Sequence, residues 1–211
     1  EFVIGIVFVE AVGVTIFLLM IPLFVITRGI KKPTLGQIFY FFAVGAGFMF
    51  VELYFIKCFV LLFGDPVISF TLVLAGMLIF TSFGGLWMHQ KIQCSVQVAL
   101  LMLIGVLILT AAVYELLAAD LLKASTTLRY LIALLILLPS GFLMGLPFPI
   151  GMRYIASGPV QRAYAWSVNG CASVLTSIVA AQVAISFGIP FIIACAVGAY
   201  LLALLAIAKY G

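Results

Sequence analysis

Charged residues and histidine are scarce in this sequence. Only 8% of the 211 residues are charged and 67% are hydrophobic, whereas a soluble domain has roughly 25% charged and 45–50% apolar residues. So few polar side chains cannot cover the surface of a water-soluble globule, which excludes that class of protein. We therefore expect an integral membrane protein surrounded by a lipid bilayer.

The shortage of histidine and the spacing of cysteine exclude several kinds of metal or redox site. His89 is the single histidine, so the chain cannot hold a haem between two of its own histidines, nor a multi-histidine metal cluster. The four cysteines form no C-x-x-C pair and are expected to be small buried side chains: Cys58, Cys94, Cys171 and Cys195. The cofactor is unknown, because a bound lipid or quinone would be held by apolar contacts that leave no sequence signature.

The excess of basic over acidic residues does not indicate a nucleic-acid partner. The formal net charge is +4 and the pI is near 9.0. However, the basic residues are scattered one to three per loop, with no basic stripe interleaved with aromatic side chains. We therefore expect no nucleic-acid partner, and we attribute the excess to loop charges that orient a membrane protein.

Seven apolar runs are each at least 18 residues long, which favours transmembrane helices over buried helices of a soluble protein. They cover about residues 2–27, 36–63, 67–88, 96–117, 130–150, 163–187 and 191–208. We expect an all-α, polytopic membrane helix bundle of about seven transmembrane helices, with residues 1–211 forming a single transmembrane domain. The chain starts at Glu1 without a signal-peptide pattern, so we expect a processed product or a fragment of a longer multi-pass protein of a bacterial-type inner or plasma membrane.

The distribution of Lys and Arg between alternate sides of these runs predicts the orientation. Seven lie on one side and three on the other, and the positive-inside rule places the richer side in the cytoplasm. The N-terminus is then outside and the C-terminus inside. The richer side holds Arg28, Lys31, Lys32, Lys91, Arg153, Arg162 and Lys209, and the other side holds Lys57, Lys123 and Arg129.

Ionisable side chains inside the apolar runs are the candidates for a substrate or ion site. Such a group costs about 2.5–3.5 kcal/mol at the centre of a membrane helix, so it usually faces protein or water. Glu52 lies well inside the second run. Lys57 follows five residues later, rotated away from Glu52 and able to snorkel to the interface. Glu10 in the first run is a second candidate. For Glu52, a proton or cation site and a structural, hydrogen-bonded glutamate are both open.

The sixth run has a stripe of small and polar residues at every fourth position. Its members are Ala165, Asn169, Ser173 and Ser177. Small residues let helix backbones approach, and an Asn side chain can bond across helices, so the stripe predicts a packing seam; a substrate-lining face opposite Glu52 is the alternative. Gly141 and Gly145 form a G-x-x-x-G pattern, which also predicts helix packing.

Two prolines interrupt the end of the fifth run. Pro147 and Pro149 each remove an amide donor, so the helix breaks there. Carbonyl groups freed near the membrane are tolerated only against protein or water. We expect a kinked terminus with Arg153 anchored at the cytoplasmic face. This terminus is either a gate or a plain helix end, and we favour the helix end.

Four motifs, taken in order, resemble the membrane domain of the fused spermidine synthase-like, major-facilitator-like membrane proteins. They are GAGFMFVEL at 45–53, FGDP at 63–66 leading to the glycine pair at 84–85, GFLMGLPFPIGMR at 141–153, and YAWSVNG at 164–170. The resemblance covers about residues 36–208 and implies that Glu52 and the Asn169 region matter. Lys57-Cys58 departs from the family, which often has a Gln-Arg pair there. The aminopropyltransferase-like part of the family is missing from this chain.

Three functions follow as hypotheses. The first is an integral membrane accessory or assembly subunit, or the membrane domain of a larger spermidine synthase-like protein, without its own catalytic centre and joined to other membrane subunits or to a second copy of itself. The second is a small-molecule or ion transporter with a polar site around Glu52 and Asn169. The third is an enzyme component that relies on a domain elsewhere, since we expect no activity from this chain alone. We place the first ahead, because seven spans with only a few buried polar groups have too little polar lining for a typical transporter.

Overall fold

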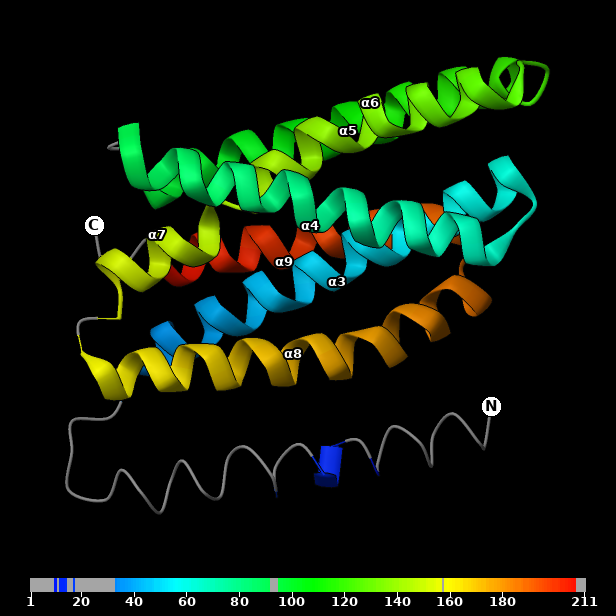
Figure 1. Ribbon diagram of the computed structural model, residues 1–211. Helices are drawn as coiled ribbons and strands as arrows, with labels where there is room; N and C mark the ends of the chain where they lie inside the picture. The colour runs from blue at the N-terminus through cyan, green and yellow to red at the C-terminus, as the bar shows by residue number, and fades with distance from the viewer. Residues whose placement is uncertain are drawn as a thin grey trace.

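The computed structural model describes residues 10, 12–14, 17, 33–91, 95–156 and 158–207, apart from the side chains of 88–91. From residue 33 on, this part of the chain folds into helices joined by short connections (Figure 1). Their bounds are α3 Leu35–Phe63, α4 Pro66–Lys91, α5 Val96–Leu121, α6 Thr126–Met144, α7 Pro147–Tyr154, α8 Pro159–Ser186 and α9 Ile189–Ile207.

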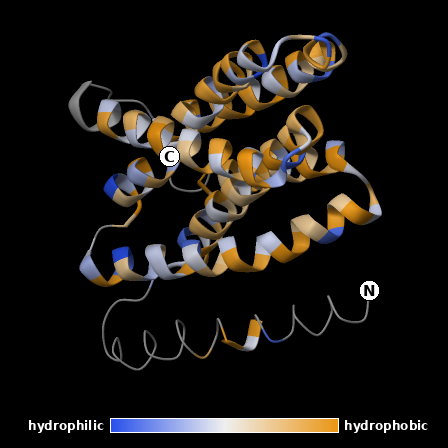
Figure 2. Ribbon diagram, turned by 45° about the vertical axis from the view of Figure 1, so that its right-hand side comes forward, coloured by the Kyte–Doolittle hydropathy of each residue, from blue (hydrophilic) through white to orange (hydrophobic). Residues whose placement is uncertain are grey.

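Six helical segments of the described chain are long and apolar enough to cross a membrane, with α6 and α7 taken together as one. Hydrophobic residues run along the helices, and most of the hydrophilic ones lie near helix ends (Figure 2). The predicted all-α, multi-pass membrane bundle is confirmed. The first predicted run, 2–27, lies almost wholly outside the described residues, so a seventh span stays a prediction.

Helix α3 is the centre of the bundle. It packs mainly against α9 and α8, and also against α4, while α4 pairs with α6, and α5 packs against α6 and α9. In Figure 1, α8 lies on one side of α3 and the α5–α6 pair lies on the other. The side chains of Tyr40, Phe55 and Phe59 on α3 are fully buried, as expected for a helix that is surrounded by other helices rather than by lipid.

The turn between α3 and α4 is built from Gly64 and Asp65. Gly64 adopts a left-handed conformation with a φ of 71°, and its N–H donates to the Val60 carbonyl; this kind of helix end favours glycine. The Asp65 carboxylate then accepts the N–H groups of Val67 and Ile68 at 2.8 and 3.1 Å, which caps the start of α4. The short turn holds α3 and α4 antiparallel (Figure 1).

The fifth predicted span differs most from the structure. Expected over 130–150, it is helical from Thr126, contains Pro139 in its interior and stops at Met144. The chain turns there, and α7 begins with Pro147. A proline at the first position of a helix lacks only an N–H that would have had no partner. The break expected at the prolines is therefore followed at once by a second, shorter helix.

Basic side chains of the described residues lie at both ends of the bundle. Arg153 and Arg162 flank the connection from α7 to α8 at one end, and Lys123 and Arg129 flank the connection from α5 to α6 at the other (Figure 1). Lys57 lies within two turns of the end of α3, on that second side. Outside the described residues lie Arg28, Lys31, Lys32 and Lys209, together with the side chain of Lys91. Which end faces the cytoplasm stays a prediction.

Candidate functional site

Glu52 lies near the middle of α3, and only 8% of its surface is exposed. Its carboxyl group makes no hydrogen bond or ion pair with any residue that the structure describes. Gly45 lies seven residues earlier, two helical turns away, so both residues are on one face of α3. That face packs on α8, because a Cβ atom at Gly45 would lie 2.7 Å from both the side-chain nitrogen and the carbonyl oxygen of Asn169. Glu52 is therefore directed toward α8.

Thr176 is the polar residue of α8 at the depth of Glu52. It follows Asn169 by seven residues, so it shares the face that packs on α3, and only 5% of its surface is exposed. Helices α3 and α8 run in the same direction (Figure 1), so two turns beyond the contact between Gly45 and Asn169 lead to Glu52 on one helix and to Thr176 on the other. The Thr176 hydroxyl makes no hydrogen bond with the described residues.

Asn169 itself ties α8 to α3. Its side-chain amide donates to the Phe41 carbonyl at 3.3 Å, and its own carbonyl accepts the Ser173 hydroxyl at 3.0 Å. Asn169 is half-buried. The side chain thus makes the bond across helices that a packing seam requires, two turns away from Glu52.

The stripe of the sixth run rotates out of this interface. Residues four apart advance by about 40° more than one full turn, so a stripe of this spacing moves around the helix. Ala165 is buried against the core, whereas Ser173 and Ser177 are only half-buried. The buried face continues instead through Ala172 and Thr176.

Lys57 and Glu10 do not join this site. Lys57 is exposed, as its rotation away from Glu52 predicts, and has no ionic partner among the described residues. Glu10 is exposed as well. Glu52 therefore carries the one carboxyl group that the described spans bury between helices.

Gly141 and Gly145 hold α6 against α4 at backbone distance. A Cβ atom at Gly145 would collide with the Thr81 carbonyl oxygen, and one at Gly84 would collide with the Phe142 carbonyl oxygen. At Gly141 the added atom would lie 2.9 Å from the Phe80 Cβ atom. The predicted G-x-x-x-G pattern is thus one half of a crossing whose other half is the glycine pair at 84–85.

Helix α7 is fastened to the start of α3. The Tyr40 hydroxyl donates to the Pro147 carbonyl at 2.6 Å, and the Gln37 side-chain amide donates to the Ile155 carbonyl at 2.7 Å. The Tyr40 ring also packs where a Cβ atom at Gly151 would lie. These bonds satisfy backbone carbonyls around the break in the way that a membrane environment demands.

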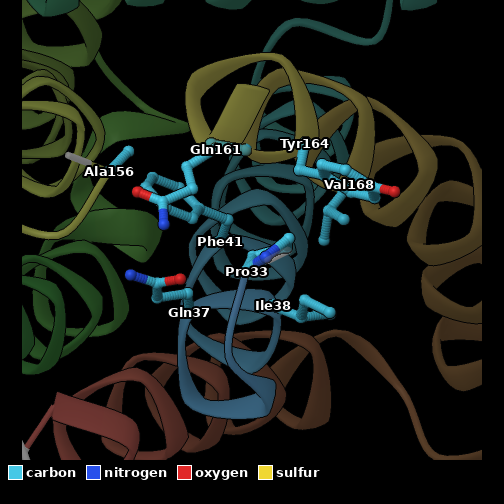
Figure 3. A pocket seen from close by; sticks show the side chains of 9 residues that line it. Pro33, Gln37, Ile38, Phe41, Ala156, Gln161, Tyr164 and Val168 are labelled. Carbon is cyan, nitrogen blue, oxygen red and sulfur yellow. The ribbon is translucent and has the colours of Figure 1, made fainter. Parts of the chain in front are cut away.

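Pro149 and Arg153 complete this end of the bundle. Pro149 lies in the first turn of α7, and Arg153 is exposed in its last turn, with its guanidinium 5.5 Å from the centre of the Tyr154 ring. Figure 3 shows the neighbouring cavity between the starts of α3 and α8, lined in part by Gln37 and Gln161. Its volume of about 10 Å³ has room for roughly one water molecule, so it is not a substrate site.

Several polar residues of the core were not predicted from the sequence. The Thr110 and Ser140 hydroxyls lie 3.1 Å apart between α5 and α6, beside Pro139. The Tyr114 hydroxyl donates to the Cys58 carbonyl at 2.7 Å. A polar residue inside an apolar run is the signal that could have found them, as it found Glu52.

Comparison of the chain with known protein families, curated proteins and solved structures finds no match. The resemblance of residues 36–208 to spermidine synthase-like membrane proteins therefore stays a prediction.

Proposed function

We propose that this chain is a membrane accessory or assembly domain, either a subunit of a larger complex or the membrane domain of a larger spermidine synthase-like protein. It holds a transmembrane helix of its partner against α4 and α6, and the chemistry of the assembly comes from the partner. The observation that supports this role best is an apolar groove between α4 and α6 that follows the full membrane-spanning length of α4.

Two adjoining hollows form the groove. Their volumes are about 510 and 480 Å³, and Phe80 lines both. On α4 the lining residues recur at helical spacing from Val67 to Trp87, and the opposite wall on α6 is formed by Leu134, Leu138 and Phe142. Almost all of these side chains are apolar, so the groove fits an apolar occupant.

The dimensions of the groove match a transmembrane helix. From Val67 to Trp87 there are 20 steps along α4, which is about 30 Å at 1.5 Å per residue and equals the thickness of a bilayer hydrocarbon core. Small exposed residues lie in its wall at Thr71 and Ala75. Small side chains allow a second helix backbone to approach closely, which is how membrane helices associate.

The glycine crossing beneath the groove keeps its walls at a fixed distance. Because α4 and α6 touch backbone to backbone at Gly84 and Gly145, neither helix can slide over the other without losing that contact. A preformed groove lowers the cost of ordering on binding. We propose further that the end of the bundle with Arg153 and Arg162 faces the cytoplasm, where the resemblance would place the second domain of the larger protein.

The experiment is site-specific photo-crosslinking of the full chain in its native membrane. A photoreactive residue at position 75 lies in the groove, and one at position 112 lies on an exposed face of α5 as the matched control. We expect a covalent protein adduct from position 75 and none from position 112. The added Phe80→Ala substitution, which widens the groove, should lower the yield at position 75 without changing the amount of folded chain.

The same experiment distinguishes the occupants. If both positions react only with lipid, the groove holds acyl chains and the assembly role is contradicted. An adduct of twice the chain mass identifies a second copy of this chain, and mass spectrometry of any larger adduct identifies a different membrane protein. Either protein adduct supports the role.

The second candidate function is transport, and the burial of Glu52 is the observation that favours it. Asn169 is less available to bind a substrate than the sequence predicts, because its side-chain amide already donates to the Phe41 carbonyl. Ion or small-molecule uptake by proteoliposomes that contain the chain, and its loss in Glu52→Gln, would support a carrier. Uptake equal to that of empty liposomes would remove this candidate.

A further inference from the structure

We propose that Arg153, Tyr154, Arg162 and Trp166 form a binding site for the phosphate group of an anionic phospholipid, at the end of the bundle where α7 connects to α8. The two arginines bind the phosphate, and the two aromatic side chains hold the lipid at the membrane surface. The site does not depend on the assembly role proposed above, because its residues belong to α7 and α8 and not to the groove between α4 and α6.

Both arginines lie on the short connection between α7 and α8. The Arg162 Nε–H donates to the Ala156 carbonyl at 3.4 Å, which holds this side chain of α8 against the end of α7. Arg153 precedes Ala156 by three residues, and the Ala156 N–H bonds back to the Gly151 carbonyl, so Arg153 and Ala156 are neighbours on one turn. Both arginines are exposed, and hydrophilic residues mark the end of α7 and the start of α8 in Figure 2.

The helices around this pair of arginines carry no carboxylate. All six acidic residues of the sequence lie at or before position 120, so α6, α7, α8 and α9 contain none, and neither does the part of α3 that precedes Glu52. At the opposite end of the bundle, by contrast, Asp120 pairs with Lys123 at 3.7 Å. The positive charge at the connection from α7 to α8 is therefore left for an anion from outside these helices.

Two exposed aromatic side chains flank the arginines. The Arg153 guanidinium lies 5.5 Å from the centre of the Tyr154 ring. Trp166 follows Arg162 by four residues, about 6 Å farther along α8, and its ring packs edge-on against Phe148 of α7 at 4.7 Å. The Trp166 side chain is still 64% exposed. Because Trp and Tyr gather where the hydrocarbon core meets the headgroups, the arginines lie at the level of the lipid phosphates and Trp166 lies beside the acyl chains.

An anionic phospholipid fits this arrangement better than a zwitterionic one. The guanidinium group of arginine binds two phosphate oxygens at once, and basic pockets between transmembrane helices bind anionic headgroups. In phosphatidylcholine a choline cation lies next to the phosphate and is repelled by the arginines, whereas phosphatidylglycerol has no cation. Free inorganic phosphate has the same oxygens but no acyl chain to contact Trp166, so a measurement at Trp166 can separate these two sources.

The test is quenching of tryptophan fluorescence by lipids with brominated acyl chains, with the full chain reconstituted in phosphatidylcholine vesicles. The sequence has two tryptophans, so Trp87→Phe leaves Trp166 as the single reporter. We expect brominated phosphatidylglycerol to bind beside Trp166 about fivefold more strongly than brominated phosphatidylcholine, which is the effect of one basic residue at a membrane surface. Trp166→Phe leaves Trp87 on α4 as the reporter, and the preference there should be smaller.

Substitution of both arginines tests their role. Arg153→Gln with Arg162→Gln, made in the Trp87→Phe chain, should remove the preference for phosphatidylglycerol at Trp166. Lys57→Gln with Lys123→Gln is the matched control, because it removes the same charge from exposed side chains at the other end of the bundle, and it should leave the preference in place. Sodium chloride should weaken the preference, since salt screens exposed charges. If the arginine variant fails to fold, this salt titration of the Trp87→Phe chain decides.

Any of four results overturns the proposal. The first is equal quenching of Trp166 by the two lipids. The second is an equal preference at Trp166 and Trp87, which would mean a general attraction to the basic end of the bundle. The third is a preference that survives the loss of both arginines or does not change with salt. The fourth is loss of the preference when inorganic phosphate replaces chloride at constant ionic strength, which would assign the arginines to a soluble anion. Photo-crosslinking at position 75 can fail while this site is present, and the reverse, so the two proposals are tested separately.

Discussion

At the scale of single residues, Gly145 allows the closest approach of two helix backbones. We expect Gly145→Ala to destabilise the chain by about 1–3 kcal/mol, because the new Cβ atom would collide with the Thr81 carbonyl, which cannot rotate away as a side chain could. The measurement is thermal unfolding of the purified chain in mild detergent, followed by circular dichroism.

Gly105 provides the control, since nothing lies within 4 Å of a Cβ atom there. Gly105→Ala on exposed α5 should leave stability unchanged or raise it by up to about 1 kcal/mol, the difference in helix propensity. Equal losses for both substitutions would show that the crossing of α4 and α6 has no special requirement for glycine.

The hydroxyl of Tyr40 is the second residue-scale feature with a measurable effect. Tyr40→Phe removes the bond to the Pro147 carbonyl and leaves that carbonyl buried, at an expected cost of about 1–2 kcal/mol. Tyr154→Phe, on an exposed side chain of α7, should cost less than about 0.5 kcal/mol. Urea or detergent titration of both variants measures the difference, and indistinguishable values would mean that α7 is not held by this bond.

Sequence patterns identify such residues only when the pattern is local. Glu52 is conspicuous because one carboxyl interrupts an apolar run. The burial of Thr176 is not conspicuous, because it depends on the register between two helices that are more than 100 residues apart in the chain. Tyr40 likewise contacts a carbonyl 107 positions away, and no periodicity within α3 reports that partner.

At the scale of elements, Arg129 joins the ends of three helices. Its guanidinium donates to the carbonyls of Leu62 at the end of α3 and of Leu122 and Ala124 after α5, while its backbone belongs to the first turn of α6. Carbonyls at helix C-termini have no partner within the helix and carry partial negative charge. A cation at this point therefore stabilises two helix ends at once.

Arg129→Met should lower stability by about 1–2 kcal/mol, because it leaves those carbonyls without a charged donor. Lys123→Met is the control in the same connection. Its ion pair with Asp120 is 3.7 Å long and both side chains are about 80% exposed, and such pairs contribute almost nothing. Thermal unfolding of the two variants decides the matter, and a larger loss for Lys123→Met would contradict the capping role.

Most elements of the fold could be predicted, because a run of 18 or more apolar residues satisfies its backbone in lipid only as a helix. The α6–α7 span was harder. Pro139 lies in its interior although proline disfavours that position. Side chains of α3 then bind the two ends of α7: Tyr40 binds the carbonyl of its first residue, Pro147, and Gln37 binds the carbonyl of Ile155, just after its last residue. Those partners come from tertiary contacts that a hydropathy profile does not contain.

At the scale of the whole molecule, the bundle has two unlike surfaces around α3. The interface with α8 buries Glu52 and Thr176, whereas the groove between α4 and α6 exposes apolar walls to the membrane. The groove suits an occupant as long as the bilayer is thick.

Orientation is also a property of the whole molecule. Among the described residues, two basic side chains, Arg153 and Arg162, lie at one end of the bundle and three lie at the other. The predicted excess of positive charge at the first end therefore depends on the basic residues outside the described part of the chain. The test uses intact cells that express a chain whose native cysteines are replaced by alanine, treated with an impermeant maleimide. We expect the cysteine of Tyr154→Cys to be protected from the reagent. We expect the cysteine of Thr127→Cys to be labelled. Both positions are exposed on the protein, so accessibility to the reagent reports the side of the membrane. The opposite labelling would reverse the orientation, and it would place the partner's domain on the outer face while leaving the groove and the burial of Glu52 unchanged.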